Sequence, residues 1–332
     1  MVLASHSERG IPTEISIDTL SDLELWIRHF RQANGIWGFG EHGWLQFHFR
    51  GKLFKLGRLQ FEISRYYFDH PVYRHRRTEK IVVLAADGAR FREDGQFDGA
   101  NEIEEPNAWT ATLQSSSRGV IGYPFHPTGR AEHLSVELVA DEWEQILARR
   151  DPVLGVHIPA TGAMDFDACG HSFARALPFF AKHFPDLQPR AFICTSWLLD
   201  HQLTDYLDEQ SNIVRFLKEW YLLPLKGASD HETFQRVFGA SSTASSTAEL
   251  STLPQENSLQ RAIVGHALGG GRWREAGGLL IPDVHQRWGE QIYQSGWSVK
   301  MASEDWRGVT FQHGSIIAGG SRGQRPDEAL RF

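Results

Sequence analysis

One stretch of the sequence, strand-like at both ends and helical between them, constrains the fold more than any other. An apolar run at 153–158 is followed by a break at Gly162. From 165 to 184, large apolar side chains then recur every three or four residues. This period is typical of a helix with one buried face. A second apolar run at 191–197 predicts another strand. A strand, a helix and a strand in this order predict two neighbouring strands of one sheet.

Patterns elsewhere in the chain predict further strands and helices. Apolar and polar residues alternate strictly at 59–64, as in a strand with one buried face. The other predicted strands are 81–86 and 133–139. The predicted helices are 17–33, 43–56, 141–149, 199–207, 212–220 and 258–268. Together these elements predict an α/β (α+β) fold, a mixed β-sheet flanked by helices, with a small helical C-terminal extension.

Composition sets the domain organisation that we expect. The chain has 332 residues, of which 41% are hydrophobic and 23% charged, so it can bury a sizeable core. A Ser/Thr/Ala-rich linker at 240–253 would separate a main domain at 15–239 from an extension at 254–310. We expect residues 1–14 to be flexible and residues 311–332 to be disordered.

Charge and cysteine content limit the partners of the chain. The net charge of −7 argues against nucleic acid, because phosphate backbones require clustered Lys and Arg. The longest apolar run, 81–86, is far shorter than the ~18 residues of a membrane-spanning helix. No secretory signal is visible, and Cys169 and Cys194, the two cysteines, are interpreted as reduced thiols. We therefore expect a cytoplasmic protein without a nucleic-acid or membrane partner.

The sixteen histidines raise the question of a metal. None of them lies in an HExxH, HxH or Cys/His spacing that would place several donors on one ion. The sequence therefore predicts no metal. A metal-dependent hydrolase with dispersed histidine ligands stays open as a third hypothesis.

Several long blocks of the sequence resemble a known family. They are GFGEHGWLQFHFRGKLFKLGRLQFE at 38–62, VLGVHIPATGAMDFDACGHSFARALPFF at 153–180, FICTSWLLD at 192–200, SNIVRF at 211–216 and LPQENSLQRAIVGHALGGG at 253–271. The blocks resemble bacterial acyltransferase-domain proteins, in which an N-acyltransferase N-terminal domain precedes a GNAT-like C-terminal domain. The resemblance implies transfer of an acyl group from acetyl-CoA or another acyl-CoA to an amine or hydroxyl of a small-molecule acceptor.

Two features depart from the family pattern. Only about 36 residues precede the first block, so we expect the N-terminal domain to be missing or truncated, or replaced by a separate domain or protein partner. The family often has a histidine between the cysteine and the serine of its CxSWLL block, where this chain has Thr195. A non-catalytic binding or interaction module that keeps the fold is therefore the alternative hypothesis.

The loop after the strand at 153–158 is the candidate site for the acyl-CoA pyrophosphate. In GNAT-like folds the pyrophosphate binds consecutive backbone amides where a central strand turns into a helix. By resemblance, these positions are Ala160, Thr161, Gly162 and Ala163. Asp165, a natural N-cap, and Asp167 compete with phosphate for the same amides, so an ordinary capped helix is the alternative.

The two hypotheses predict different geometries for this region. An acyltransferase should have its strands at 153–158 and 191–197 splayed apart at one end, with an open slot beside 160–163. A binding module should have closely paired strands and a slot filled by side chains.

Two residues are candidates for the general base. His157 projects to the other face of its strand from its apolar neighbours, and an imidazole is suited to proton transfer near neutral pH. Its alternative is a packed histidine under a helix. Glu62 lies on the polar face of its own strand together with Gln60. Its alternative is a solvent-facing carboxylate.

Two hydroxyl groups complete the candidate catalytic residues. Ser196 lies on the second strand, where its hydroxyl could contact a thioester or a backbone carbonyl. Tyr206 follows that strand, and the resemblance implies a tyrosine there that protonates the leaving thiolate. A packed tyrosine is its alternative. Cys194 is interpreted as a buried structural cysteine.

Overall fold

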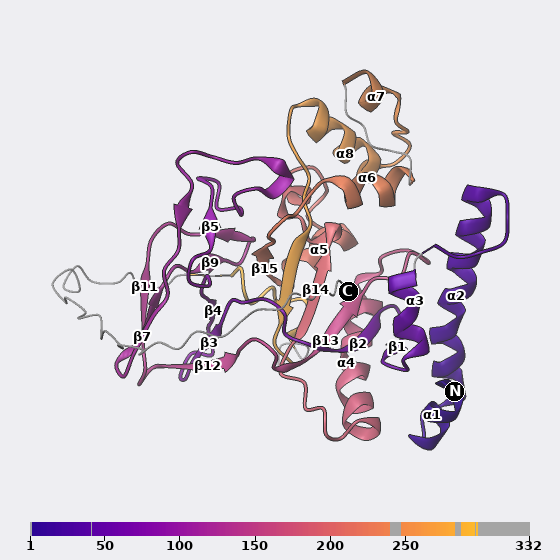
Figure 1. The fold of residues 1–332 in the computed structure, drawn as a ribbon, viewed down its shortest axis with the longest axis horizontal. Coiled ribbons are helices and arrows are strands. Elements are labelled where there is room, and N and C mark those ends of the chain that lie inside the picture. The colour runs from indigo at the N-terminus through magenta and orange to yellow at the C-terminus, as the bar shows by residue number, and fades with distance from the viewer. Residues whose placement is uncertain (1, 41, 240–246, 283–286, 296, 298–332) are drawn as a thin grey trace, which may run out of the picture. The chain divides into compact units, whose positions relative to one another are not determined.

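A mixed sheet of six strands runs through the centre of the described part of the chain (Figure 1). The computed structural model describes residues 2–40, 42–239, 247–282, 287–295 and 297, which belong to the first of two units, residues 1–302. The strands of the sheet, in spatial order, are β1 (Leu53–Lys55), β2 (Gln60–Arg65), β13 (Pro152–His157), β14 (Phe192–Ser196), β16 (Ala276–Leu280) and β15 (Tyr221–Pro224). β13 and β14 are parallel and the other neighbours antiparallel, which confirms the predicted mixed sheet.

Helix α4 (Phe166–His183) connects β13 to β14 and covers one face of the sheet. Asp165 is the N-cap of the helix, and its Oδ1 accepts a hydrogen bond from the Ala168 amide at 2.7 Å. Its apolar stripe packs on the strands: the ring centroid of Phe173 lies 5.7 Å from that of Phe61 and 5.0 Å from that of Phe192. The predicted strand–helix–strand unit is confirmed.

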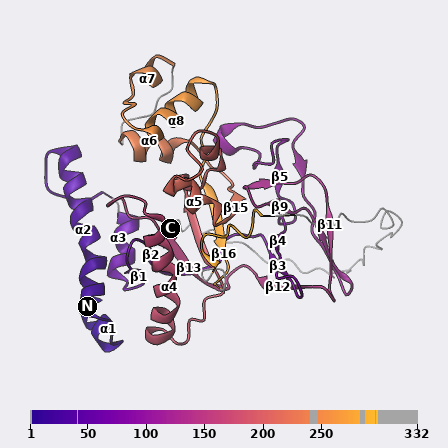
Figure 2. The same cartoon turned by 180° about the vertical axis from the view of Figure 1, so that it is seen from behind.

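Three helices precede the sheet and lie beside its β1 edge, as the two opposite views show (Figures 1 and 2). They are α1 (Val2–Glu8), α2 (Thr13–Asn34) and α3 (His42–Phe49). The helix expected at 17–33 is therefore longer. The segment expected to be flexible, 1–14, contains α1, whose His6 is buried and 2.9 Å from the Ser16 hydroxyl.

The helix predicted at 43–56 is wrong in its second half. It ends at Phe49, because Gly51 adopts a left-handed φ of +60° and strand β1 follows. Gly57, expected to end the helix, has a φ of +92° and instead turns the chain between β1 and β2.

A second region of short strands adjoins the β15 edge of the sheet (Figure 1). Its strands are β3 (Val72–His75), β4 (Ile81–Val83), β5 (Arg90–Phe91), β6 (Trp109–Thr110), β7 (Gln114–Ser116), β8 (Gly119–Gly122), β9 (Phe125–His126), β10 (Arg130–Ala131), β11 (Val136–Val139) and β12 (Trp143–Leu147). The predicted strands at 81–86 and 133–139 appear as β4 and β11. The helix predicted at 141–149 is wrong: this segment is β12, which pairs with β3.

The remaining helices follow β14. They are short 3₁₀ helices at Trp197–Leu199 and His201–Asp205, then α5 (Asn212–Lys218), α6 (His231–Phe238), α7 (Thr247–Thr252) and α8 (Ser258–Leu268). Of the predicted linker at 240–253, residues 240–246 lie outside the described residues, as does the predicted tail at 311–332.

Strand β16 corrects the expectation of a separate helical extension. It lies inside the central sheet, pairing with β14 on one side and with β15 on the other. The extension predicted at 254–310 therefore supplies a strand of the main fold, which the predicted boundary at 239 would have excluded.

His70, buried between the sheet and the second region, predicts acid sensitivity. Its Nδ1 accepts a hydrogen bond from the Ala86 amide at 3.0 Å, and burial lowers its pKa from 6.5 to about 4. As the pH falls, the imidazole is therefore protonated at a higher pH in the unfolded chain than in the folded chain. The free energy of unfolding should decrease as the pH drops from 6.5 towards 4, by at most about 1.4 kcal/mol per pH unit. Urea unfolding of the native protein and His70→Gln at several pH values checks this. An equally steep loss in His70→Gln would contradict it.

Candidate functional site

Strands β13 and β14 pair over a short length and then separate. Their parallel register joins Leu154 to Phe192 and Gly155 to Ile193. Beyond these pairs β13 stays bonded to β2, and β14 to β16. A cleft of about 510 Å³, here called the splay cleft, is lined by the separated ends of the two strands. The splayed strands and open slot predicted for an acyltransferase are therefore present.

The loop at 160–163 borders the splay cleft with backbone N–H groups that have no partner among the described residues. Within the described residues, the N–H groups of Ala160 to Met164 donate no hydrogen bond. Ala160 and Gly162 line the cleft, whereas Thr161 and Ala163 are not among its lining residues. Gly162 has a φ of +77°, and a Cβ there would meet nothing within 4 Å. Such a row of free amides before a helix suits an anion.

The two acids at the start of α4 accept no hydrogen bond from the N–H groups of this loop in the described residues. Asp165 accepts from the Ala168 amide, inside the helix, and leaves the loop amides free. The Asp167 carboxylate is exposed and lies 3.9 Å from the guanidinium of Arg215. The helix is thus capped and the loop remains available, so the two readings of this stretch are compatible.

Arg58 fixes the shape of the loop. Its Nε donates to the carbonyl of Ala163 at 2.8 Å, and its other guanidinium nitrogens donate to the carbonyls of Pro159 and Gly162 at 3.1 and 3.4 Å. Because the carbonyls turn towards Arg58, the loop amides are free to face another group. Sequence reasoning missed this residue, although it directly follows a turn glycine in the first family block.

The N-terminal helices supply one wall of the splay cleft. Oδ2 of Asp22 on α2 accepts hydrogen bonds from the indole nitrogens of Trp26 and Trp44 at 3.1 and 2.8 Å, and lies 3.2 Å from Nε2 of His48. Burial acts to raise the pKa of this carboxyl, but the contacts with His48 and the tryptophans outweigh it and lower the pKa. Asp22, Trp26 and Trp44 all line the cleft.

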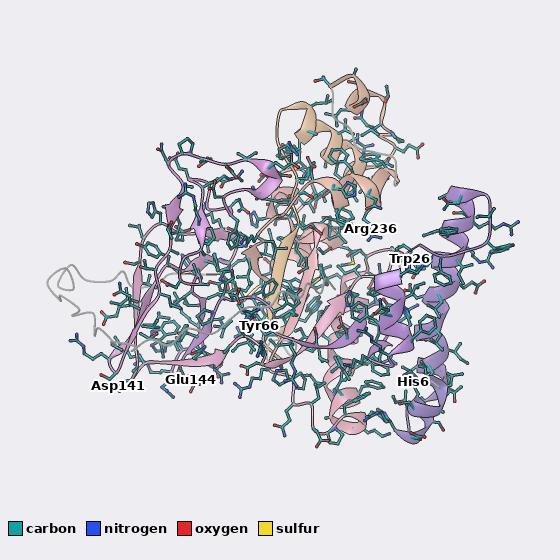
Figure 3. The ribbon with its side chains drawn as sticks, in the orientation of Figure 1. His6, Trp26, Tyr66, Asp141, Glu144 and Arg236 are labelled. Atoms are coloured by element: carbon teal, nitrogen blue, oxygen red, sulfur yellow. The ribbon has the colours of Figure 1, made fainter. Side chains whose placement is uncertain are left out.

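Helix α6 faces the same wall. Its Arg236 guanidinium lies 5.6 Å from the ring centroid of Trp26 and is paired with Glu232 at 2.9 Å (Figure 3). Since Arg236 and Glu232 also line the cleft, α2 and α6 border it from two sides.

The structure brings the two predicted base candidates together. Nε2 of His157 lies 3.2 Å from Oε2 of Glu62 on the neighbouring strand, and the His157 ring packs edge-on against Trp44 at 4.6 Å. His157 lines the splay cleft, and 31% of its side-chain surface is exposed to solvent, so the imidazole is partly buried and still accessible from the cleft. The pair can hold the imidazole in a fixed orientation.

The other predicted residues have different outcomes. Ser196 lines the splay cleft, and its Oγ accepts a hydrogen bond from the Leu198 amide at 3.1 Å. Tyr206 lies apart: it lines neither described cleft, and its hydroxyl contacts Nδ1 of His266 at 2.9 Å. Cys194 is buried, and burial raises the pKa of its thiol to about 12, in agreement with a structural role.

A second cleft, of about 620 Å³, lies where the sheet adjoins the region of short strands; it is here called the strand-region cleft. Its lining combines apolar residues with charged side chains of both signs: Asp69, Asp87, Arg90, Asp98, Lys226 and Glu275. Two residues, Thr195 and Glu275, line both clefts.

Two further findings bear on the hypotheses made from the sequence. The described residues contain no group of three or more His, Cys, Asp and Glu side chains placed to hold a metal ion. Among the helices in the described ranges, none has the length and apolar character needed to cross a bilayer.

Comparisons with known proteins agree with this geometry. Residues 53–280 match the family model of the GNAT-like C-terminal domain, and residues 1–51 match that of the N-acyltransferase N-terminal domain. The expectation that the N-terminal domain is missing is therefore wrong: α1 to α3 fall in the second match. No curated protein matches the sequence.

Solved structures of acyltransferases are similar over most of this chain. One, a variant acyltransferase in complex with octanoyl-CoA, is 25% identical with a TM-score of 0.54 and covers 84% of this chain. Another, an acyltransferase in complex with decanoyl-CoA and teicoplanin, is 26% identical with a TM-score of 0.53 and covers 83%. The matches span 62% and 61% of those two chains, so this chain aligns with about three fifths of their length.

The family match covers the whole central sheet and both strands that form the splay cleft. The chain therefore belongs to the family of proteins with a GNAT-like C-terminal domain.

Proposed function

We propose that this protein transfers an acyl group from an acyl-CoA to an amine or hydroxyl group of a small-molecule acceptor. The observation that carries the proposal is the splay cleft, which opens between β13 and β14 and ends at the free amides of the loop at 160–163. The similar acyltransferases in complex with octanoyl-CoA and decanoyl-CoA support the same ligand class. A binding module with a filled slot would lack this opening.

In the proposed complex, the loop amides would bind the pyrophosphate of the acyl-CoA. The N-terminus of α4 and the guanidinium of Arg58, which lines the cleft, add positive potential at this end of it. The aromatic wall formed by Trp26 and Trp44 suits an apolar acyl chain. His157, held by Glu62, lies along the same cleft and remains a proposed contributor to proton transfer.

The acceptor would bind in the strand-region cleft. This cleft contains charged side chains of both signs and reaches the splay cleft at Thr195 and Glu275, so that a nucleophile in one could meet a thioester in the other. One similar acyltransferase is in complex with teicoplanin, which supports a small-molecule acceptor. A cytoplasmic location stays a prediction.

A matched pair of variants at Gly162 tests the proposal. Asn and Asp both tolerate the left-handed backbone at this position, and a side chain there meets open space, so both variants should fold. Asp adds a negative charge beside the proposed pyrophosphate site. We expect Gly162→Asp to bind octanoyl-CoA at least about tenfold more weakly than Gly162→Asn.

Isothermal titration calorimetry and thermal unfolding with acetyl-CoA, octanoyl-CoA and decanoyl-CoA provide the measurement. Saturating ligand should raise the melting temperature of the native protein, since it binds the folded state alone. Absence of stabilisation by all three thioesters would refute the proposed function. Equal affinities of the two Gly162 variants would refute the location of the pyrophosphate.

A further inference from the structure

The residues shared by the two clefts mark where acyl donor and acceptor would meet. Thr195 lies on β14 and Glu275 directly before β16. The antiparallel register pairs Thr195 with Gly277, so these two residues share one face of the sheet. Glu275 precedes Gly277 by two positions, and continued alternation brings its side chain to the same face. The carboxyl group and the threonine hydroxyl thus border the junction together.

Glu275 differs from every other carboxylate in the strand-region cleft. Asp69 is paired with Arg149 at 3.0 Å, Asp98 with Arg90 at 2.8 Å, and Asp87 accepts from the Leu113 amide at 3.1 Å. Within the described part of the chain, Glu275 has neither a hydrogen bond nor an ion pair. Its oxygens are therefore available to a ligand.

The carboxylates of the splay cleft are also occupied. Asp22 accepts from Trp26 and Trp44, and Glu232 is paired with Arg236. Glu62 is held by His157 and lines neither cleft. Among the described residues, Glu275 is thus the one carboxylate that lines both clefts and is not already engaged.

The surroundings of Glu275 suit proton transfer. The side chain is half-buried, and burial raises the pKa of its carboxyl group. From α6, the Glu232 carboxylate raises this pKa further, while Arg236 and His231 oppose the rise. A carboxylate with a raised pKa is a better proton acceptor near neutral pH than an ordinary one. Thr195, the other residue that lines both clefts, carries no titratable group.

We propose that Glu275 is the catalytic base that accepts a proton from an amine acceptor bound in the strand-region cleft. This inference rests on the proposed function and assigns a residue to its first step: the acceptor is an amine that is protonated in solution. The unpartnered carboxylate at the junction would first attract the ammonium group and then deprotonate it.

The acceptor nitrogen loses two protons during the reaction. The ammonium nitrogen gives one proton to the Glu275 carboxylate, and its freed electron pair forms the bond to the acyl carbon. The second N–H proton is lost as the tetrahedral intermediate collapses and the carbon–sulfur bond breaks. One proton ends on the CoA thiolate and the other passes to solvent, so the products are an amide and free CoA thiol. No oxidant or metal enters the balance.

The test compares two amines that need the base to different degrees. A simple alkylamine is protonated at neutral pH, whereas hydroxylamine is already neutral and needs no base before attack. Release of CoA thiol from octanoyl-CoA would be measured for the native protein, Glu275→Gln, Glu275→Asp and the matched control Glu142→Gln, an exposed carboxylate in the turn before β12. We expect Glu275→Gln to lose about 10²–10³-fold with the alkylamine and far less with hydroxylamine.

Further measurements distinguish a wrong assignment of Glu275 from a wrong proposed function. Glu275→Gln should bind octanoyl-CoA with native affinity, and Glu275→Asp should retain part of the alkylamine activity. The melting temperature of Glu275→Gln at neutral pH should equal or exceed that of the native protein, because this variant removes a partly desolvated charge. A Glu275→Gln variant as fast as the native protein, or equally slow with both amines, would overturn the assignment. So would a native protein that binds octanoyl-CoA and transfers to neither amine. A native protein that binds no acyl-CoA would instead refute the proposed function.

Discussion

Replacing Phe173 by alanine is expected to lower the free energy of unfolding by about 3–5 kcal/mol. The Phe173 ring is fully buried between helix α4 and the sheet. Its centroid lies 5.0 Å from that of Phe192, 5.7 Å from Phe61 and 5.8 Å from Trp220. These rings come from separate elements, so none of them can move far to fill the space. The cost therefore includes a cavity as well as the lost burial.

Urea unfolding followed by tryptophan fluorescence measures this effect. The matched control is Phe49→Ala, since Phe49 keeps 58% of its surface exposed at the end of α3 and should lose less than about 0.5 kcal/mol. If both variants lost the same free energy of unfolding, the packing of Phe173 in the core would not be the cause.

Replacing Asp22 by alanine should have the second largest effect, about 3 kcal/mol. The substitution leaves two indole N–H groups and the imidazole of His48 without their common partner in a buried site. Trp26 and Trp44 also line the splay cleft, so the variant should bind octanoyl-CoA more weakly as well as unfold more easily. Calorimetry and urea unfolding of the same preparation measure both effects.

The pH dependence of this cluster has a defined sign. The pKa of Asp22 is lower in the folded chain than its ordinary value of 3.8, so its stabilising contribution is complete above that value and is lost as the pH falls below it. Asp22→Asn keeps one oxygen acceptor for the indoles and should lose less stability than Asp22→Ala. The exposed Asp18→Ala on the same helix is the control; if it were as destabilised as Asp22→Ala, the buried contacts would not be the cause.

The parts of the fold that could be predicted are those whose signal lies in the spacing of residues close together in the sequence. The apolar spacing of α4, its Asp165 cap and the apolar runs of β13 and β14 each depend on neighbouring residues, and all are confirmed. The splay of the two strands followed from the family resemblance rather than from any local pattern. The pairing of β16 between β14 and β15 had no local signal, because its partners lie far earlier in the chain.

Two incorrect helices have the same physical origin. The segment 141–149 has acids at its start and arginines at its end, as a helix prefers, yet residues 143–147 gain more by pairing with β3. The segment 43–56 contains two glycines that could end a helix, Gly51 and Gly57, and spacing alone did not distinguish them. In both cases tertiary contacts decided between conformations that the local sequence permits.

The site was predicted only in part, for a related reason. His157 and Glu62 were identified separately, but their contact across two strands depends on register. Tyr206 was assigned by its position after a strand, and the short helices that follow turn it towards His266 instead. Glu275 stands beside a glycine-rich run with no motif around it. Its importance appears only when β16 enters the sheet.

The late position of β16 has a consequence for the order of events during synthesis. Strands β14 and β15 are made well before residues 276–280, yet both need β16 to satisfy their facing backbone groups. A growing chain on the ribosome therefore carries an open gap in its sheet until the segment around residue 280 has left the exit tunnel. Because Glu275 arrives with the same segment, the proposed proton acceptor reaches the junction only as the gap closes. The proposed catalytic centre would thus be completed by the same strand pairing that closes the sheet.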